Sequence, residues 1–183
     1  MKNKKVQFVT RTAVLLALCV VLQLVNLGQW VTGPAVNLIL LLAAMSGGLP
    51  CGLTVAVLNP LLVFVIKNPP IMLACPAILV EVMLGNCVLV ALAWALRKPL
   101  MGIPGLVAAA VGKGLAMFLL TGYVVLPLFG ANLPDKLKMA AMASFGIIQM
   151  ATAAIGAAVF FAVWQIVKKV PGFAAQEKQT EKN

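Results

Sequence analysis

The chain has 183 residues, of which 63% are hydrophobic and only 10% are charged, and its mean hydropathy is +1.08. Soluble domains carry more charge and fewer apolar residues, so this composition excludes an ordinary soluble domain and indicates an integral membrane protein. A net charge of +10 would suggest nucleic acid binding in a soluble protein, but here the basic residues lie at the ends of apolar segments. We therefore expect them to contact the lipid bilayer, and we expect no nucleic acid partner.

The first apolar segment is predicted to span the membrane from about Phe8 to Leu27. It follows a basic start, which marks the cytoplasmic side. It is too long for a secretory signal, and no small-x-small cleavage site follows it. Ala13 and Ala17 lie one turn apart near its start and form a flat patch that lets another helix approach closely. The stretch from Gln29 to Pro34 is expected to be an outer loop.

Two short helices are predicted between Ala35 and Ile66, joined by a turn in the sequence GGLPCG from Gly47 to Gly52. Asn37 and Asn59 are polar residues within these helices. Because proline removes a backbone hydrogen bond, Asn59–Pro60 is expected to loosen the second helix.

The next two spans carry the only ionisable side chains that lie deep inside apolar segments. The span Pro76–Arg97 contains Glu81, and the span Pro104–Leu126 contains Lys113. A charge near the middle of a membrane helix costs about 2.5–3.5 kcal/mol or more, so it normally faces a partner, a cavity or a ligand.

The last span is predicted from about Met139 to Val167, after a loop from Phe129 to Lys138, and Pro171–Asn183 is expected to be a disordered polar tail. The expected fold class is therefore all-α, an integral membrane bundle of six transmembrane helices formed by residues 1–170. Ten of the fourteen Lys and Arg residues would then face the cytoplasm and three would face out, with Lys113 inside the membrane. This asymmetry predicts that both termini are cytoplasmic.

Glu81 and Lys113 have two interpretations. In the first they line a ligand pocket, where Lys113 binds a carboxylate or carbonyl and Glu81 binds a protonated nitrogen or an N–H. In the second they form a structural ion pair between neighbouring helices. Intramembrane charges are functional by default but do pair with each other, so both interpretations stay open.

Further candidates for substrate binding are polar or aromatic. The amides Asn37, Asn86 and Gln149, with Asn59, could reach a pocket, although each alone is more simply explained as a hydrogen bond between helices. Trp30 and Tyr123 could stack on a ligand ring or close the entrance, although either alone suits an ordinary aromatic belt residue at the membrane surface.

Metal and nucleotide chemistry have little support in the sequence. There is no histidine, and Cys19, Cys51, Cys75 and Cys87 show no C-x-x-C spacing, so we expect no metal site and no cofactor. No nucleotide-binding motif is present either. If the protein takes part in ATP-driven transport, the ATPase must be another chain.

Taken together, these features resemble the substrate-binding S component of energy-coupling factor (ECF) transporters, the bacterial vitamin importers. The resemblance covers about Lys5 to Lys169 and rests on the chain length, the six predicted spans and the basic start that runs into Ala13 and Ala17. The stretches Glu81–Asn86 (EVMLGN) and Ile148–Gly156 (IQMATAAIG) are also similar to that family.

The resemblance implies a function and a set of partners. An S component sits in the bacterial plasma membrane, is not itself an enzyme, and binds a vitamin or similar small molecule near the outer face. A coupling membrane protein and two ABC-type ATPases then drive its delivery inward. Ala13 and Ala17 would be the contact with the coupling protein. The resemblance does not identify the vitamin.

Three rival functions follow from the same residues. A proton-coupled secondary transporter would use Glu81 as its coupling carboxylate, but the sequence shows neither an internal repeat nor an obviously broken helix. A membrane enzyme would have few acid–base or metal-binding candidates. A purely structural membrane protein would need Glu81 and Lys113 only for folding.

Overall fold

The structure is a computed structural model that describes residues 2–25, 27–97 and 102–167. Every regular element in these ranges is a helix, so the expected all-α class is confirmed. In chain order the helices are α1 Lys2–Leu24, α2 Gln29–Lys67, α3 Pro70–Ala74, α4 Ala77–Leu96, α5 Ile103–Leu119, the π-helical segment η1 Leu120–Val125, α6 Leu126–Phe129, α7 Asp135–Ala141, the π-helical segment η2 Met142–Ile147 and α8 Ile148–Val167.

Five helical stretches in the described residues are long and apolar enough to cross a membrane. They are Lys5–Leu24, Gln29–Lys67, Ala77–Leu96, Ile103–Phe129 and Asp135–Ile166. Many large apolar side chains on their outer surfaces are exposed, as expected of helices whose solvent is lipid. The chain therefore has the makeup of a membrane protein that crosses the bilayer several times.

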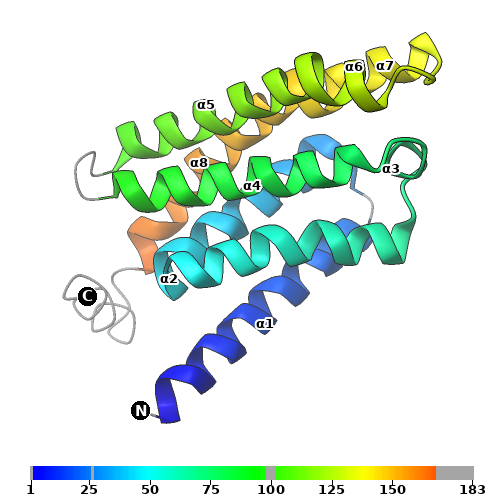
Figure 1. Cartoon of the computed structure of the whole chain (residues 1–183). Helices are drawn as coiled ribbons and strands as arrows, with labels where there is room; N and C mark the ends of the chain where they lie inside the picture. Colours follow the sequence, from blue (N-terminus) through cyan, green and yellow to red (C-terminus); the bar gives the residue numbers. More distant parts are fainter. Residues whose placement is uncertain (1, 26, 98–101, 168–183) are drawn as a thin grey trace.

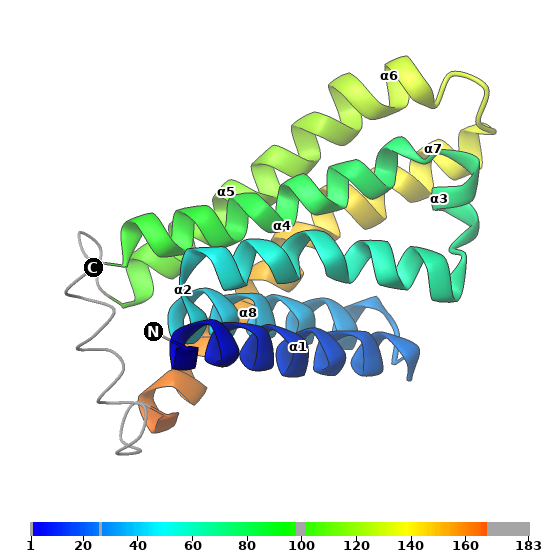
Figure 2. The same ribbon diagram turned by 60° about the horizontal axis from the view of Figure 1, so that its bottom comes forward.

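Helix α2 consists of two helical arms joined by a sharp bend and forms a hairpin. A straight helix of its 39 residues would measure roughly 60 Å, about twice the thickness of the hydrocarbon core. Gly48 interrupts it with φ 83° and ψ 170°, a conformation that glycine adopts readily because it has no Cβ. The two arms, residues 29–47 and 49–67, lie side by side and run in opposite directions (Figures 1 and 2). The turn predicted between Gly47 and Gly52 is thus found at Gly48.

Other boundaries differ from the sequence-based expectations. The stretch from Gln29 to Pro34, expected to be a loop, forms the first turns of α2. The helix keeps helical dihedral angles through Asn59–Pro60, because Gly48 is the only residue of α2 with non-helical ones; Pro60 still lacks the N–H for one backbone hydrogen bond. Inside a bilayer the backbone must satisfy its own hydrogen bonds, which keeps a polar or proline-containing stretch helical. At the other end of the chain α7 begins at Asp135, within the expected loop. The predicted polar tail lies outside the described residues.

The helices form one bundle with two distinct ends (Figure 1). The start of α1, the bend of α2, the end of α4 and the start of α5 lie at one end, where Arg11 donates a 2.8 Å hydrogen bond to the Ser46 carbonyl. We call this the basic end. At the opposite end lie the link from α1 to α2, the short helix α3, and the turn between α6 and α7. Helices α4 and α8 pack against the α2 hairpin, and α5 packs against α4 and α8, whereas α1 lies at the edge and packs mainly on α2.

Close packing between helices depends on small residues. A Cβ atom added at Gly114 on α5 would lie 2.4 Å from the Met150 Cβ atom at the start of α8. A Cβ at Gly156 on α8 would lie 2.7 Å from the carbonyl oxygen of Pro34 on α2. Without a hydrophobic driving force between helices in lipid, association depends on such close contact. These glycines therefore hold α5, α8 and α2 at the spacing that shapes the interior.

Candidate functional site

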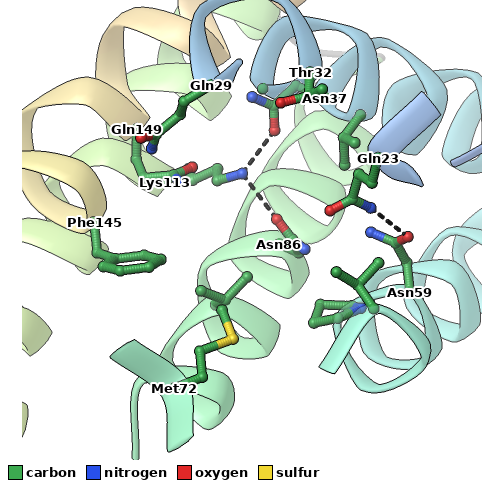
Figure 3. Close-up of a pocket in the computed structure, with 15 residues that line it drawn as sticks. Gln23, Gln29, Thr32, Asn37, Asn59, Met72, Asn86, Lys113, Phe145 and Gln149 are labelled. Carbon is green, nitrogen blue, oxygen red and sulfur yellow. Dashed lines mark hydrogen bonds between the residues drawn. The ribbon is translucent and has the colours of Figure 1, made fainter. Parts of the chain in front are cut away.

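The bundle contains a cavity of about 150 Å³ in the half nearer the opposite end. Its walls come from seven helical elements, so it lies between residues far apart in sequence, and Figure 3 shows part of this lining. It is lined by Gln23, Gln29, Thr32, Gly33, Val36, Asn37, Asn59, Pro60, Val63, Met72, Val82, Asn86, Lys113, Phe145 and Gln149.

Lys113 is the charged residue of this cavity, and it lies at mid-length of α5. Its side chain is only 2% exposed. The ammonium donates hydrogen bonds to Oδ1 of Asn37 at 2.6 Å and Oδ1 of Asn86 at 2.8 Å, which joins α5 to α2 and α4 (Figure 3). An ammonium has three N–H donors, so one remains for a further acceptor. Both bonds are to neutral amides, so they orient the cation without neutralising it.

A second pair of amides closes the side of the cavity next to α1. Gln23 Nε2 donates a 2.7 Å hydrogen bond to Oδ1 of Asn59 on the second arm of α2 (Figure 3). Gln29, at the start of α2, donates a 2.7 Å bond to the carbonyl oxygen of Ser144 in η2. These bonds fix the helix ends that surround the cavity near the opposite end of the bundle.

Apart from Thr32 and Gln149, the remaining lining is apolar. Val36, Val63 and Val82 contribute branched aliphatic groups, and Met72 and Phe145 contribute a thioether and an aromatic face. Figure 3 shows Phe145 on the left and Met72 at the bottom, whereas Asn86 lies near the centre and Asn37 at the top. A small ligand with an apolar or planar body and polar edges matches this mixture.

Glu81 does not belong to this cavity. It is only 1% exposed, and its Oε1 is hydrogen-bonded to the hydroxyl of Thr121 in η1. Within the described residues there is no ion pair between Glu81 and Lys113, because the ammonium of Lys113 is bonded to Asn37 and Asn86 instead. The structural ion pair considered from the sequence is therefore wrong, and the two groups have separate environments.

Other predicted residues separate into two groups. Asn37, Asn86, Lys113 and Gln149 line the cavity together. Trp30 and Tyr123 do not line it, and their side chains are 60% and 74% exposed. Neither aromatic ring covers the cavity in this structure.

Several lining residues were not among the candidates predicted from the sequence. Gln29, Thr32, Gly33, Val36 and Asn37 recur at the helical spacing i, i+3, i+4, i+7 and i+8 and form one stripe along the first arm of α2. This signal is present in the sequence but was hidden because the stretch from Gln29 to Pro34 was expected to be a loop. Gln23, Met72 and Phe145 have no comparable signal.

Ala13 and Ala17 lie away from the cavity, near the basic end. Both are exposed on the outer face of α1. On the buried face of the same helix, the hydroxyl of Thr12 donates a hydrogen bond to Sγ of Cys51 on α2. The small-residue patch is thus open to lipid or to another protein.

Comparisons with known proteins give no match to a family model, a curated protein or a solved structure.

Proposed function

We propose that this protein is the membrane-embedded substrate-binding subunit of an ATP-driven importer of the ECF type, and that it binds a small anionic, vitamin-like molecule. The observation that carries this proposal is the single unneutralised ammonium of Lys113 inside a cavity whose other polar groups are amides and a hydroxyl. No carboxylate is among the residues that line the cavity. A bound anion would supply the missing counter-charge.

The chemistry of the lining narrows the ligand class. Asn and Gln amides both donate and accept hydrogen bonds, so they suit a ligand with N–H and C=O groups at its edge. Phe145 suits a planar or apolar body. At about 150 Å³ the cavity is smaller than the 300–1,000 Å³ typical of pockets for drug-sized ligands. The proposed ligand is therefore a small molecule with one carboxylate or similar anionic group.

The topology proposed for this function has six spans. The two arms of α2, residues 29–47 and 49–67, each have about the length of one span and would count separately. Arg11 and Arg97 at the basic end support a cytoplasmic position for that end. The cavity then lies in the outer half of the bilayer, where a bacterial importer would collect its ligand.

The partners proposed for transport are a coupling membrane protein and two ABC-type ATPases in the bacterial plasma membrane. The exposed patch of Ala13 and Ala17 supports a helix-to-helix contact near the cytoplasmic end, because alanine side chains let backbones approach closely. Transport by this mechanism needs ATP and the partners, and the chain alone provides the binding site.

The test has two parts. First, the tagged chain is isolated from its native host in mild detergent, and both the accompanying proteins and the small molecules released on denaturation are identified by mass spectrometry. We expect two ATPases, a larger membrane protein and an anionic small molecule. Second, uptake of that molecule is measured in liposomes with the isolated chain or with the complete complex. Uptake driven by a proton gradient in the isolated chain, without ATP, would contradict the proposal and favour a secondary transporter.

A further inference from the structure

The contact between Glu81 and Thr121 lies outside the proposed ligand cavity. The Thr121 hydroxyl has more hydrogen-bond contacts than hydrogens to donate. The Thr121 hydroxyl oxygen lies within hydrogen-bond distance of Oε1 of Glu81 and also 2.8 Å from the carbonyl oxygen of Met117. A threonine hydroxyl has one hydrogen to donate. The carbonyl of Met117 accepts only. Both contacts can be full two-centre hydrogen bonds only if one additional proton is present, because a single hydroxyl hydrogen shared between two acceptors gives two weaker bonds.

We propose that Glu81 carries that proton and is a neutral carboxylic acid in the folded protein. Its O–H donates to Oγ1 of Thr121, and the Thr121 hydroxyl donates to the carbonyl of Met117. The chain of three oxygens is then complete, with each hydrogen between two oxygens. Glu81 on α4 becomes a proton-binding site that joins α4 to α5 and η1.

The second carboxyl oxygen supports this assignment independently. Oε2 of Glu81 is buried and has no hydrogen-bond partner among the described residues. On an ionised Glu81 this atom would share a full negative charge with no donor beside it, which is the most expensive arrangement for a buried group. On a neutral acid the same atom is an ordinary carbonyl oxygen, and leaving it unpaired costs far less.

Within residues 2–25, 27–97 and 102–167, no cation forms an ion pair with Glu81. The charged side chains on the described helices packed against α4 are Lys67 on α2 and Lys113 on α5. Lys67 donates a 2.8 Å bond to the carbonyl of Gln23, and Lys113 is bonded to Asn37 and Asn86. The titratable neighbours are also not cationic: the Cys75 thiol lies in the adjoining apolar cluster, and the Tyr123 ring in η1 is exposed.

The composition of the chain makes this proposal directly measurable. It contains only four Asp and Glu residues in total, so the infrared spectrum has few carboxyl bands. A protonated carboxylic acid has a C=O stretch above the amide I band that shifts in D₂O, whereas an ionised carboxylate absorbs well below it. The full-length protein in detergent at neutral pH is compared with Glu81→Gln. The control is Asp135→Asn, because the Asp135 side chain is 94% exposed.

We expect Glu81→Gln to lose one protonated acid band while Asp135→Asn loses only an ionised carboxylate band. If Glu81→Gln loses an ionised band and wild type shows no protonated acid band, the proposal is overturned. Should Glu81→Gln fail to fold, Thr121→Val decides the question in its place. A neutral Glu81 that loses its acceptor should keep its acid band at a shifted frequency, and an absent or unshifted band would overturn the assignment.

Glu81→Gln also distinguishes a fixed proton on Glu81 from a proton that moves during transport. A glutamine amide can donate to Thr121 much as the acid does, so Glu81→Gln should retain uptake in the complete complex. If a folded Glu81→Gln lacks the acid band and also loses uptake, the proton of Glu81 must move during transport. This result would overturn the assignment of that proton as a fixed part of the fold. The infrared result for Glu81→Gln does not depend on whether the ligand of the cavity is anionic.

Discussion

Lys113 on α5 donates a 2.8 Å hydrogen bond to Asn86 on α4, close to the mid-length of both helices. Asn86 presents its amide oxygen to the ammonium, so the bond holds the cation in place but leaves its charge uncompensated. A stabilising core would normally pair or omit such a charge, since a buried cation without an anion lowers stability. The arrangement is instead typical of a binding site for an anionic ligand.

Replacing Lys113 by Met should weaken ligand binding about 10- to 100-fold, because a hydrogen bond to a charged group contributes about 1.5–3 kcal/mol. The measurement is the amount of co-purifying anionic small molecule per mole of protein, followed by its affinity once it is identified. Lys136→Met is the matched control, because Lys136 is exposed on α7 and is not among the residues that line the cavity. Equal ligand content in both variants would show that Lys113 does not contact the ligand.

The pair Gln23–Asn59 should couple by about 0.6 kcal/mol, and by no more than about 1.7 kcal/mol, as side-chain hydrogen bonds between membrane helices do. The measurement is a double-mutant cycle of Gln23→Met and Asn59→Leu in mixed micelles, with the free energy of unfolding as the readout. The control cycle combines Gln23→Met with Asn86→Leu, two residues that share no hydrogen bond. Identical coupling in the two cycles would mean that the Gln23–Asn59 bond is not formed in the membrane protein.

Hydropathy and glycine chemistry predicted the helical class and the bend of α2 well. Apolar runs of span length admit only helices in a bilayer, and Gly47–Gly52 was a credible turn because glycine tolerates positive φ. The start of α2 at Gln29 was missed because polar residues and Pro34 suggested a loop. In the structure Gln29, Thr32 and Asn37 share one helical face that turns inward.

The candidate site was predicted only in part, because the sequence does not show how each helix is rotated about its own axis. The sequence shows that Glu81 and Asn86 are deep in one span, but residues five apart differ by about 140° around a helix. Only one of them can face the cavity, and that one is Asn86. Whether Lys113 meets Glu81 or the amides of Asn37 and Asn86 depends on how α5 is rotated and shifted against its neighbours. Composition and spacing within one helix carry no information on that relationship.

Gly114→Ala should destabilise the protein by about 1–3 kcal/mol, because its Cβ would meet the Cβ and backbone Cα of Met150 at 2.4 and 2.9 Å and push α5 away from α8. Ligand binding should fall as well, since Lys113 is the adjacent residue. Gly112→Ala is the control, because its Cβ meets the tip of the flexible Leu92 side chain. Thermal unfolding of both variants in detergent is the measurement. A cost for Gly112→Ala equal to or above that for Gly114→Ala would contradict the packing argument.

Ala13→Trp should prevent assembly with the proposed coupling protein without reducing ligand binding. The indole would hold another helix away from a patch where the alanine side chains allow close approach, and Ala13 is remote from the cavity lining. Recovery of the ATPases in a pull-down should drop to background, while the amount of co-purifying small molecule stays at the wild-type level. Leu18→Trp is the matched control: Leu18 is also exposed on α1 but points about 100° away from Ala17. If Leu18→Trp blocks assembly and Ala13→Trp does not, the partner contacts a different face of α1. A loss of small molecule in a well-folded Ala13→Trp would instead mean that this face contributes to binding itself.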